Sequence, residues 1–200
     1  MKLGLQRSMA RHAVIMATVF GLLSALALLG YRQLTHDPGR LRVTVTQTYP
    51  QHGALRVDAE VRLALPDAVR AALSNGVPLV FSVRLQAYDA EARWRPEVVH
   101  DVEYRLHIMF HALTDKYLVI RGVDNHYSTH AALPQALLAL GALRGMTLLD
   151  NADAARHRHL AGRLRVRLAR DTLPSALQLP ARVQADWQLD TDWTHWRLPP

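Results

Sequence analysis

An uncharged apolar run occupies residues 13–31, directly after a short segment that carries Lys2, Arg7 and Arg11. A helix rises about 1.5 Å per residue, so the run covers about 28 Å, close to the roughly 30 Å hydrocarbon layer of a bilayer. Positive residues ahead of such a run tend to stay on the cytoplasmic side of the membrane. We therefore expect residues 13–31 to be a transmembrane anchor, residues 1–12 its cytoplasmic flank, and the remainder of the chain extracytoplasmic.

A cleaved secretory signal is the alternative interpretation of the same run. Its apolar region would be Ala13–Ser24, and the small residues of Ala25-Leu26-Ala27 would form the cleavage site. Apolar residues continue as far as Tyr31, which favours an uncleaved anchor. A helix that is apolar on every side suits lipid better than a half-exposed protein core. Both interpretations export the rest of the chain.

The composition limits the chemistry of the exported part. Cysteine is absent, which excludes a disulfide framework, a thiolate nucleophile and a thiol zinc site. The formal net charge of +7 includes the three basic residues of the flank, and elsewhere 21 basic residues face 17 acidic ones. These charges are interleaved, whereas a nucleic-acid interface normally gathers them on one face. We therefore expect no nucleic-acid partner.

Residues 32–40 are polar and contain Pro38-Gly39, which predicts a linker ending in a turn, so that residues 41–200 form one domain. Six segments of that domain alternate apolar and polar residues: 41–45, 55–63, 77–85, 102–110, 160–168 and 183–189. This period of two predicts strands with one buried face, which is typical of antiparallel sheets. We predict a mainly β fold, an antiparallel β-sandwich or a strongly curved sheet, with a two-layer α+β fold as the alternative.

Two short helices are predicted to cover the sheet. Residues Pro66–Asn75 have helical spacing and end before Gly76, and residues Pro134–Arg144 begin with a proline, which is tolerated in a first helical turn. The prolines from Asp171 onward predict turns, apart from the strand at 183–189.

The histidines do not have the spacing of a metal site. His107 and His111 lie on a predicted strand, where four residues span about 13 Å, too far to share one ion. His157 and His159 would share one side of the chain, but arginines flank them and no third ligand is evident. We expect no metal and no cofactor.

No catalytic residue is predicted either. His126, Ser128 and His130 alternate along the chain, but no Gly-x-Ser-x-Gly motif surrounds the serine. Asp101 and Glu103 share a strand face, and such pairs are common on exposed strands without acid–base work.

A basic stripe is the first candidate binding feature. Arg163, Arg165 and Arg167 project from one side of a predicted strand. They form either a solvated sheet face, paired with carboxylates of a neighbouring strand, or a contact surface for anionic lipid headgroups, a polyanionic polymer or an acidic protein.

An aromatic tail is the second candidate binding feature. Trp187, Trp193 and Trp196 fall within ten residues. Large aromatic residues near a terminus usually fold back to close a core, and the alternative is a docking surface, where tryptophan is enriched.

Four short motifs follow one another along the domain. They are Gly76-Val77-Pro78-Leu79 with Phe81, Leu113-Thr114 with Tyr117 and Val119, Leu173-Pro174, and Trp187-x-Leu189-x-Thr191-x-Trp193-x-x-Trp196. Over roughly residues 41–198 this set resembles the bacterial family called domain of unknown function 4390. The resemblance implies an exported or membrane-anchored protein of Gram-negative bacteria without an established activity or assigned catalytic residues. Genes of that family often neighbour one for a membrane histidine kinase of the nitrogen-regulation type.

Together these observations predict a non-enzymatic binding or accessory module. Residues 13–31 would hold it in the lipid of the inner membrane as a single pass, with the domain in the periplasm and an envelope protein, such as a sensor kinase, as partner. The alternatives are a soluble periplasmic protein after signal cleavage, an envelope hydrolase, and a carrier of a lipid or another apolar ligand.

Overall fold

The computed structural model describes residues 40–91, 97–150, 153 and 159–198. The chain divides into two compact units, Met1–Asp37 and Pro38–Pro200, and all described residues belong to the second. The predicted anchor at 13–31 therefore lies outside the described residues. Within them, no helix combines the length and the apolar character needed to cross a membrane.

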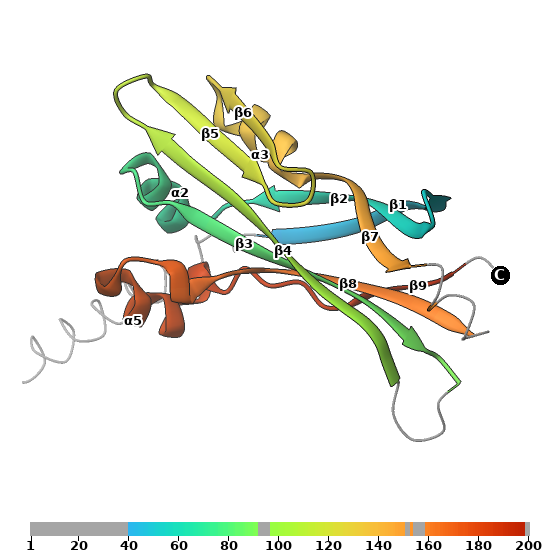
Figure 1. Ribbon diagram of the computed structural model, residues 1–200. Coiled ribbons are helices and arrows are strands. Elements are labelled where there is room, and N and C mark those ends of the chain that lie inside the picture. Colours follow the sequence, from blue (N-terminus) through green and yellow to red (C-terminus); the bar gives the residue numbers. More distant parts are fainter. Residues whose placement is uncertain (1–39, 92–96, 151–152, 154–158, 199–200) are drawn as a thin grey trace, which may run out of the picture. The chain divides into compact units, whose positions relative to one another are not determined.

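The described residues of this domain form two antiparallel sheets, which Figure 1 shows together with three α-helices. The first sheet contains, in spatial order, β1 (Arg40–Gln51), β2 (Ala54–Ala64) and β7 (Ala142–Asp150). The second contains β6 (His126–His130), β5 (Lys116–Arg121), β4 (Glu97–His111), β3 (Leu79–Asp89), β8 (Leu160–Leu168) and β9 (Thr194–Arg197). The helices are α2 (Asp67–Ser74), α3 (Leu133–Gly141) and α5 (Ser175–Val183). The prediction of a mainly β, antiparallel fold is confirmed.

One hydrophobic core lies between the two sheets and the helices. Each sheet contributes the apolar half of its alternating strands, and each helix contributes one face. Fully buried members include Val57 and Met146 from the first sheet, Phe81 and Leu106 from the second, and Leu73 and Leu140 from the helices. Burial of such side chains, at about 1.5–3 kcal/mol each, is the main force that holds the two sheets together.

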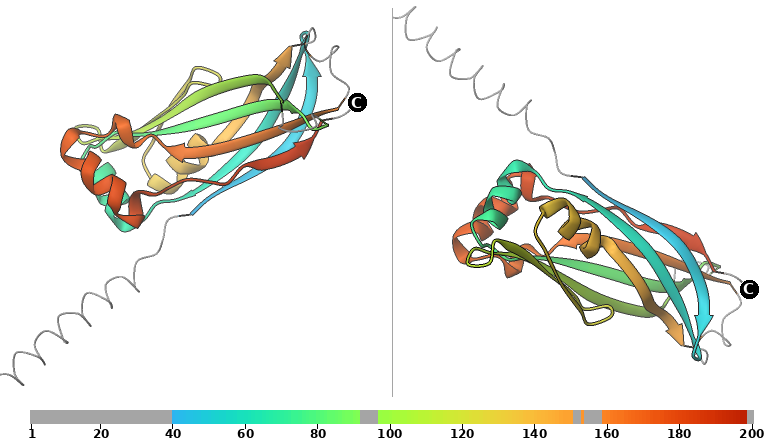
Figure 2. Two further views of the ribbon diagram at one scale, coloured as in Figure 1. Left: turned by 90° about the horizontal axis from the view of Figure 1, so that it is seen from below. Right: turned by 90° about the horizontal axis from the view of Figure 1, so that it is seen from above.

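Helices α2 and α5 lie at one end of the two sheets, and the β1–β2 hairpin lies at the other (Figure 2). The hairpin turns through His52 and Gly53, whose φ angles of 48° and 76° suit the tight turns that match the twist of paired strands.

Five of the six predicted strands are confirmed, and the one at 183–189 is wrong. Helix α5 continues to Val183, and Ala185–Trp187 forms a short 3₁₀ helix. Leu177 and Ala181, four residues apart, place one face of α5 on the core, and this helical pattern outweighs the alternation that follows it. The tail therefore holds a third helix where turns were predicted.

The second predicted helix ends three residues earlier than expected. Helix α3 stops at Gly141, and the next residues join the β2 ladder as strand β7. A Cβ atom at Gly141 would lie 1.9 Å from the carbonyl oxygen of Val61, so only glycine allows this close approach of the chain to β2. Pairing with β2 thus ends the helix.

A β-bulge interrupts the pairing of β2 with β7, where Asp58 lies opposite both Arg144 and Gly145. The buried Asp58 carboxylate accepts hydrogen bonds from the Gly145 N–H at 2.8 Å, Gln47 Nε2 at 2.9 Å and the Tyr49 hydroxyl at 3.2 Å. Burial alone raises the pKa of Asp58, but these hydrogen bonds outweigh it and lower the pKa below its ordinary value. The carboxylate therefore stabilises the bulge in its ionised form.

The close approach of Gly141 to β2 predicts that a methyl group at this position destabilises the fold. Gly141→Ala should lower the free energy of unfolding by about 1–3 kcal/mol or more, because the helix must move away from β2. Urea denaturation of the full chain measures this loss. The control Leu138→Ala, at an exposed position of the same helix, should change stability by less than about 0.5 kcal/mol. Equal effects of the two substitutions would contradict the packing described here.

The bulge predicts a pH-dependent stability difference. Asp58→Asn should cost about 1–3 kcal/mol at neutral pH, because the amide group of asparagine turns a donor toward one of the donors that now bind the carboxylate. The stabilisation by the carboxylate is complete above the unfolded pKa of about 3.9 and is lost as the pH falls through the lower pKa of the folded protein. Denaturation curves of both proteins should therefore converge below about pH 4. A constant difference across this range would rule out the ionised carboxylate as its source.

Candidate functional site

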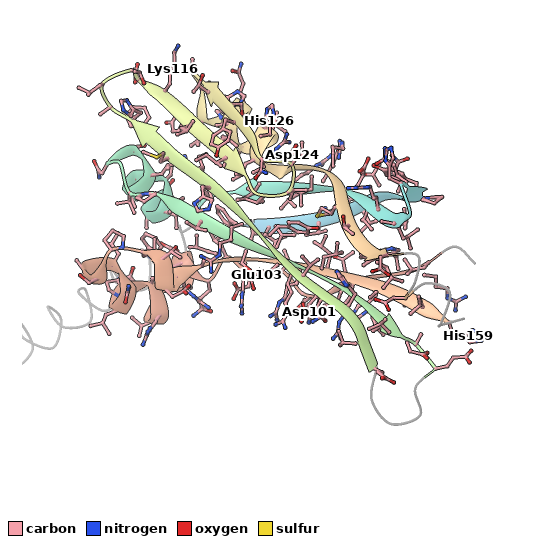
Figure 3. The ribbon with its side chains drawn as sticks, in the orientation of Figure 1. Asp101, Glu103, Lys116, Asp124, His126 and His159 are labelled. Atoms are coloured by element: carbon pink, nitrogen blue, oxygen red, sulfur yellow. The ribbon has the colours of Figure 1, made fainter. Side chains whose placement is uncertain are left out.

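The side of the six-stranded sheet that faces away from the core carries the candidate site, and we call its part on β3, β4, β8 and β9 the outer face. Alternation along β3 creates it, because Phe81, Val83 and Leu85 are fully buried while Arg84 lies on the opposite side. Figure 3 shows Asp101 and Glu103 projecting from β4 on this side. The core-facing residues thus determine which polar residues come together outside.

Strand register arranges the outer face in rows. Asp101, Gln86, Arg163 and His195 lie directly across β4, β3, β8 and β9 in one row. Side chains opposite one another on neighbouring strands are close enough to interact. The next row continues the pattern with Glu103, Arg84 and Arg165.

Hydrogen bonds connect the first row with the second. Arg84 donates through Nε to Asp101 Oδ1 at 2.9 Å, and Gln86 donates through Nε2 to Asp101 Oδ2 at 2.8 Å. Arg163 in turn donates through Nε to Gln86 Oε1 at 2.7 Å. The bond from Arg84 holds the pKa of Asp101 below its ordinary value, and the same bond raises the pKa of Arg84. Gln86 therefore orients the Arg163 guanidinium while Asp101 neutralises Arg84.

Aromatic rings hold the guanidinium groups on β8. The Arg163 guanidinium carbon lies 4.7 Å from the centre of the Trp193 ring and 5.2 Å from that of Tyr88, and Arg165 lies 4.9 Å from Trp193. These distances are within the range of about 6 Å for cation–π attraction. The Tyr88 hydroxyl lies 3.0 Å from His195 Nδ1. One tryptophan thus positions two cations.

Positive charge is in excess on this face. Across β3, β4 and β8 it carries two carboxylates, Asp101 and Glu103, against five arginines: Arg84, Arg105, Arg163, Arg165 and Arg167. Asp190, which lies opposite Arg167 in the segment before β9, adds a third carboxylate and pairs with Arg170. Within the described residues, no carboxylate forms an ion pair with Arg163, Arg165 or Arg167. Guanidinium groups held in place without a carboxylate suit an anionic ligand.

The six predicted binding residues separate into two groups. Arg163, Arg165 and Trp193 meet on the outer face, with Arg167 in its third row. Trp187 is only 3 % exposed and belongs to the core. Trp196 packs over Gly162, where a Cβ atom would lie 2.4 Å from its ring. Trp187 and Trp196 therefore close the core, as the first interpretation of the aromatic tail predicted.

Sequence reasoning missed the partners that complete the outer face. Arg84, Gln86 and Tyr88 alternate along β3, and this pattern could have placed them on one side of a strand. Their contacts with Asp101 and His195 depend on strand register, for which the sequence carried no direct signal.

Ser128 and His130 of β6 form a polar pair outside the outer face. Ser128 Oγ and His130 Nε2 lie 2.9 Å apart, which is the distance between a serine nucleophile and its base. A triad also requires a group that orients the histidine, and no carboxylate of the described part of the chain contacts His130.

The other histidines lie apart from one another. His107 and His111 both lie on β4, and burial followed by the charge of Arg105 lowers the pKa of His107. His159 lies 3.3 Å from Glu91, while His157 lies outside the described residues. Among the residues that the structure describes, no three His, Asp or Glu side chains could hold a metal ion together.

These observations define a two-sheet antiparallel β protein whose larger sheet carries a basic and aromatic face. The chain belongs to the family described as Domain of unknown function (DUF4390), whose model matches residues 40–197. The resemblance predicted from the sequence is thereby confirmed. Neither a curated protein nor a solved structure matches this chain.

The shared ring predicts coupling between Arg165 and Trp193. A double-mutant cycle with Arg165→Gln and Trp193→Leu should give about 0.5–1 kcal/mol of interaction energy in urea denaturation. Arg167→Gln provides the matched control, because Arg167 lies on the same strand without a contact to the Trp193 ring among the described residues. Similar interaction energies in the two cycles would contradict stacking of Arg165 on this ring.

Proposed function

We propose that this protein is a membrane-anchored, extracytoplasmic binding module without enzymatic activity, and that its outer face binds an acidic surface of an envelope protein. The apolar run at 13–31, the basic flank before it and the absence of cysteine support export and anchoring. In this proposal the protein crosses the inner membrane once and holds its domain in the periplasm. A soluble periplasmic form after signal cleavage is the alternative.

The observation that carries the proposal is the stacking of Arg163 and Arg165 on Trp193, while neither forms an ion pair with a carboxylate among the described residues. A guanidinium that is already positioned loses less conformational entropy when an anion binds. Arginine also binds carboxylates through two parallel hydrogen bonds, which gives geometric specificity. Arg84 differs from these two because Asp101 already neutralises it.

A membrane sensor kinase is the specific version of this partner. Its support is the frequent proximity of a gene for such a kinase to genes of the family that the chain resembles. An acidic segment of the periplasmic part of a kinase would fit the excess of arginine on β8. Crosslinking of the anchored protein in membranes, followed by identification of the crosslinked protein, tests this version directly.

Neutralising the two stacked arginines should weaken binding of an acidic probe. Arg163→Gln with Arg165→Gln should lower the affinity of the full chain for a labelled oligoglutamate peptide at low salt by about ten-fold or more, because each charge-assisted hydrogen bond contributes about 1.5–3 kcal/mol. Fluorescence anisotropy of the peptide measures the affinity.

The control for this experiment removes the same charge elsewhere. Arg42 and Arg62 lie opposite each other on the exposed side of the three-stranded sheet, and Arg42→Gln with Arg62→Gln should leave peptide affinity within about two-fold. Equal losses of peptide affinity in the two variants would show that net charge alone attracts the peptide. That result would contradict binding at the outer face.

An envelope hydrolase is the second candidate function, and the 2.9 Å distance between Ser128 and His130 is the observation that favours it. A fluorophosphonate probe reacts with activated serines and would label the full chain if this pair were catalytic. We expect no labelling, because no carboxylate of the described residues orients His130. Labelling that disappears in Ser128→Ala and in His130→Ala would instead establish the hydrolase.

A further inference from the structure

Strand β1 begins at the end of the domain that carries α2 and α5, which we call the helical end (Figure 2). Arg40, the first residue of β1, pairs with Ala64, and α2 starts three residues after Ala64. Helix α5 follows the last residue of β8, Leu168, which pairs with Phe81 near the start of β3. The chain therefore enters the domain from residues 32–39 at its helical end.

Helix α5 has two apolar faces instead of one. Leu177 and Ala181 contact the core, while Ala176, Leu179 and Val183 follow the spacing i, i+3, i+7 on the other side. Leu179 is 73 % exposed and Val183 is 80 % exposed. A helix on the surface of a soluble protein normally has a single apolar stripe, directed at the core. The outward stripe of α5 therefore lacks a partner within the described part of the domain.

The turn between β4 and β5 adds a third exposed apolar side chain at the same end. Ile108 pairs with Leu79, the first residue of β3, and β4 continues beyond this pair to His111. Leu113 follows in the turn and is 92 % exposed. Of the six large apolar residues that are exposed among those described, three thus lie at the helical end.

The length of the connecting segment limits how far this end could lie from an anchor at residues 13–31. Eight residues, 32–39, separate the apolar run from Arg40, and even when fully extended they span at most about 29 Å. The β1–β2 hairpin begins after the twelve residues of β1, about 36 Å farther along the strand. If residues 13–31 cross the membrane, the helical end is the end of the domain that is tethered nearer to the lipid surface.

We propose that the helical end rests on the membrane and that α5 places Leu179 and Val183 in the lipid headgroup region, with Leu113 as a second point of contact. This inference rests on the proposed anchoring. Exposed apolar residues on a short helix bind at the membrane interface, and a neighbouring arginine, here Arg182, interacts with anionic headgroups. Contact at the helical end fixes the orientation of the domain and directs the β1–β2 hairpin away from the bilayer.

The absence of cysteine allows a direct test. Single-cysteine variants Leu179→Cys, Val183→Cys and Leu113→Cys, and the control Gln51→Cys at the hairpin, introduce one thiol each at exposed positions. The full chain, labelled with an environment-sensitive dye, is reconstituted into phosphatidylcholine vesicles containing phosphatidylglycerol and lipids that are spin-labelled in the headgroup region. Flotation of the vesicles measures membrane attachment, and quenching of the dye measures contact with lipid.

We expect the protein to float with the vesicles, and we expect several-fold stronger quenching and bluer emission at Leu179→Cys and Val183→Cys than at Gln51→Cys. Flotation with equal quenching at all positions would overturn the membrane contact and leave the anchoring intact. Bluer emission without quenching would also overturn it, since it would indicate that a protein covers α5. A protein that does not float would overturn both the anchoring and this inference.

Discussion

The register of β3 with its two neighbours is the constraint on which the outer face depends. Phe81, Val83 and Leu85 are fully buried, and a slip of one residue would exchange them with the polar residues between them. Hydrophobic burial therefore forbids the slip and keeps Arg84 and Gln86 outside. Because both β4 and β8 pair with β3, the same burial brings residues of three strands into common rows.

The two sides of the outer face differ in charge for a physical reason. On β4, Asp101 binds Arg84 and Gln86, so its carboxylate is occupied. On β8, Gln86 presents only an amide oxygen to Arg163, and Trp193 presents only a ring. Neither group cancels a formal charge. An anion would therefore find its strongest attraction at Arg163 and Arg165 of β8, beside a neutralised region over β3 and β4.

The alternation of residues was enough to predict five strands and the basic stripe, because both depend on local spacing. It could not predict that Trp193 lies under Arg163 and Arg165, since that contact joins segments about thirty residues apart. The same limit explains α3, whose helical pattern continues past Gly141 although pairing with β2 ends the helix there. The strands β5, β6, β7 and β9 were missed. Of these, β6 and β9 have only five and four residues, too few for a periodic pattern to stand out.

Strand β9 is a short edge strand, and it begins directly after Trp193, the residue that positions the guanidinium groups of Arg163 and Arg165. Trp196, the third residue of β9, covers Gly162 of β8, and β9 pairs with β8 over only four residues. Without the pairing of β9 with β8, Trp193 would lose the strand that holds it next to Arg163 and Arg165. The positioning of both guanidinium groups therefore depends on four residue pairs at the edge of the sheet, and not on the hydrophobic core alone.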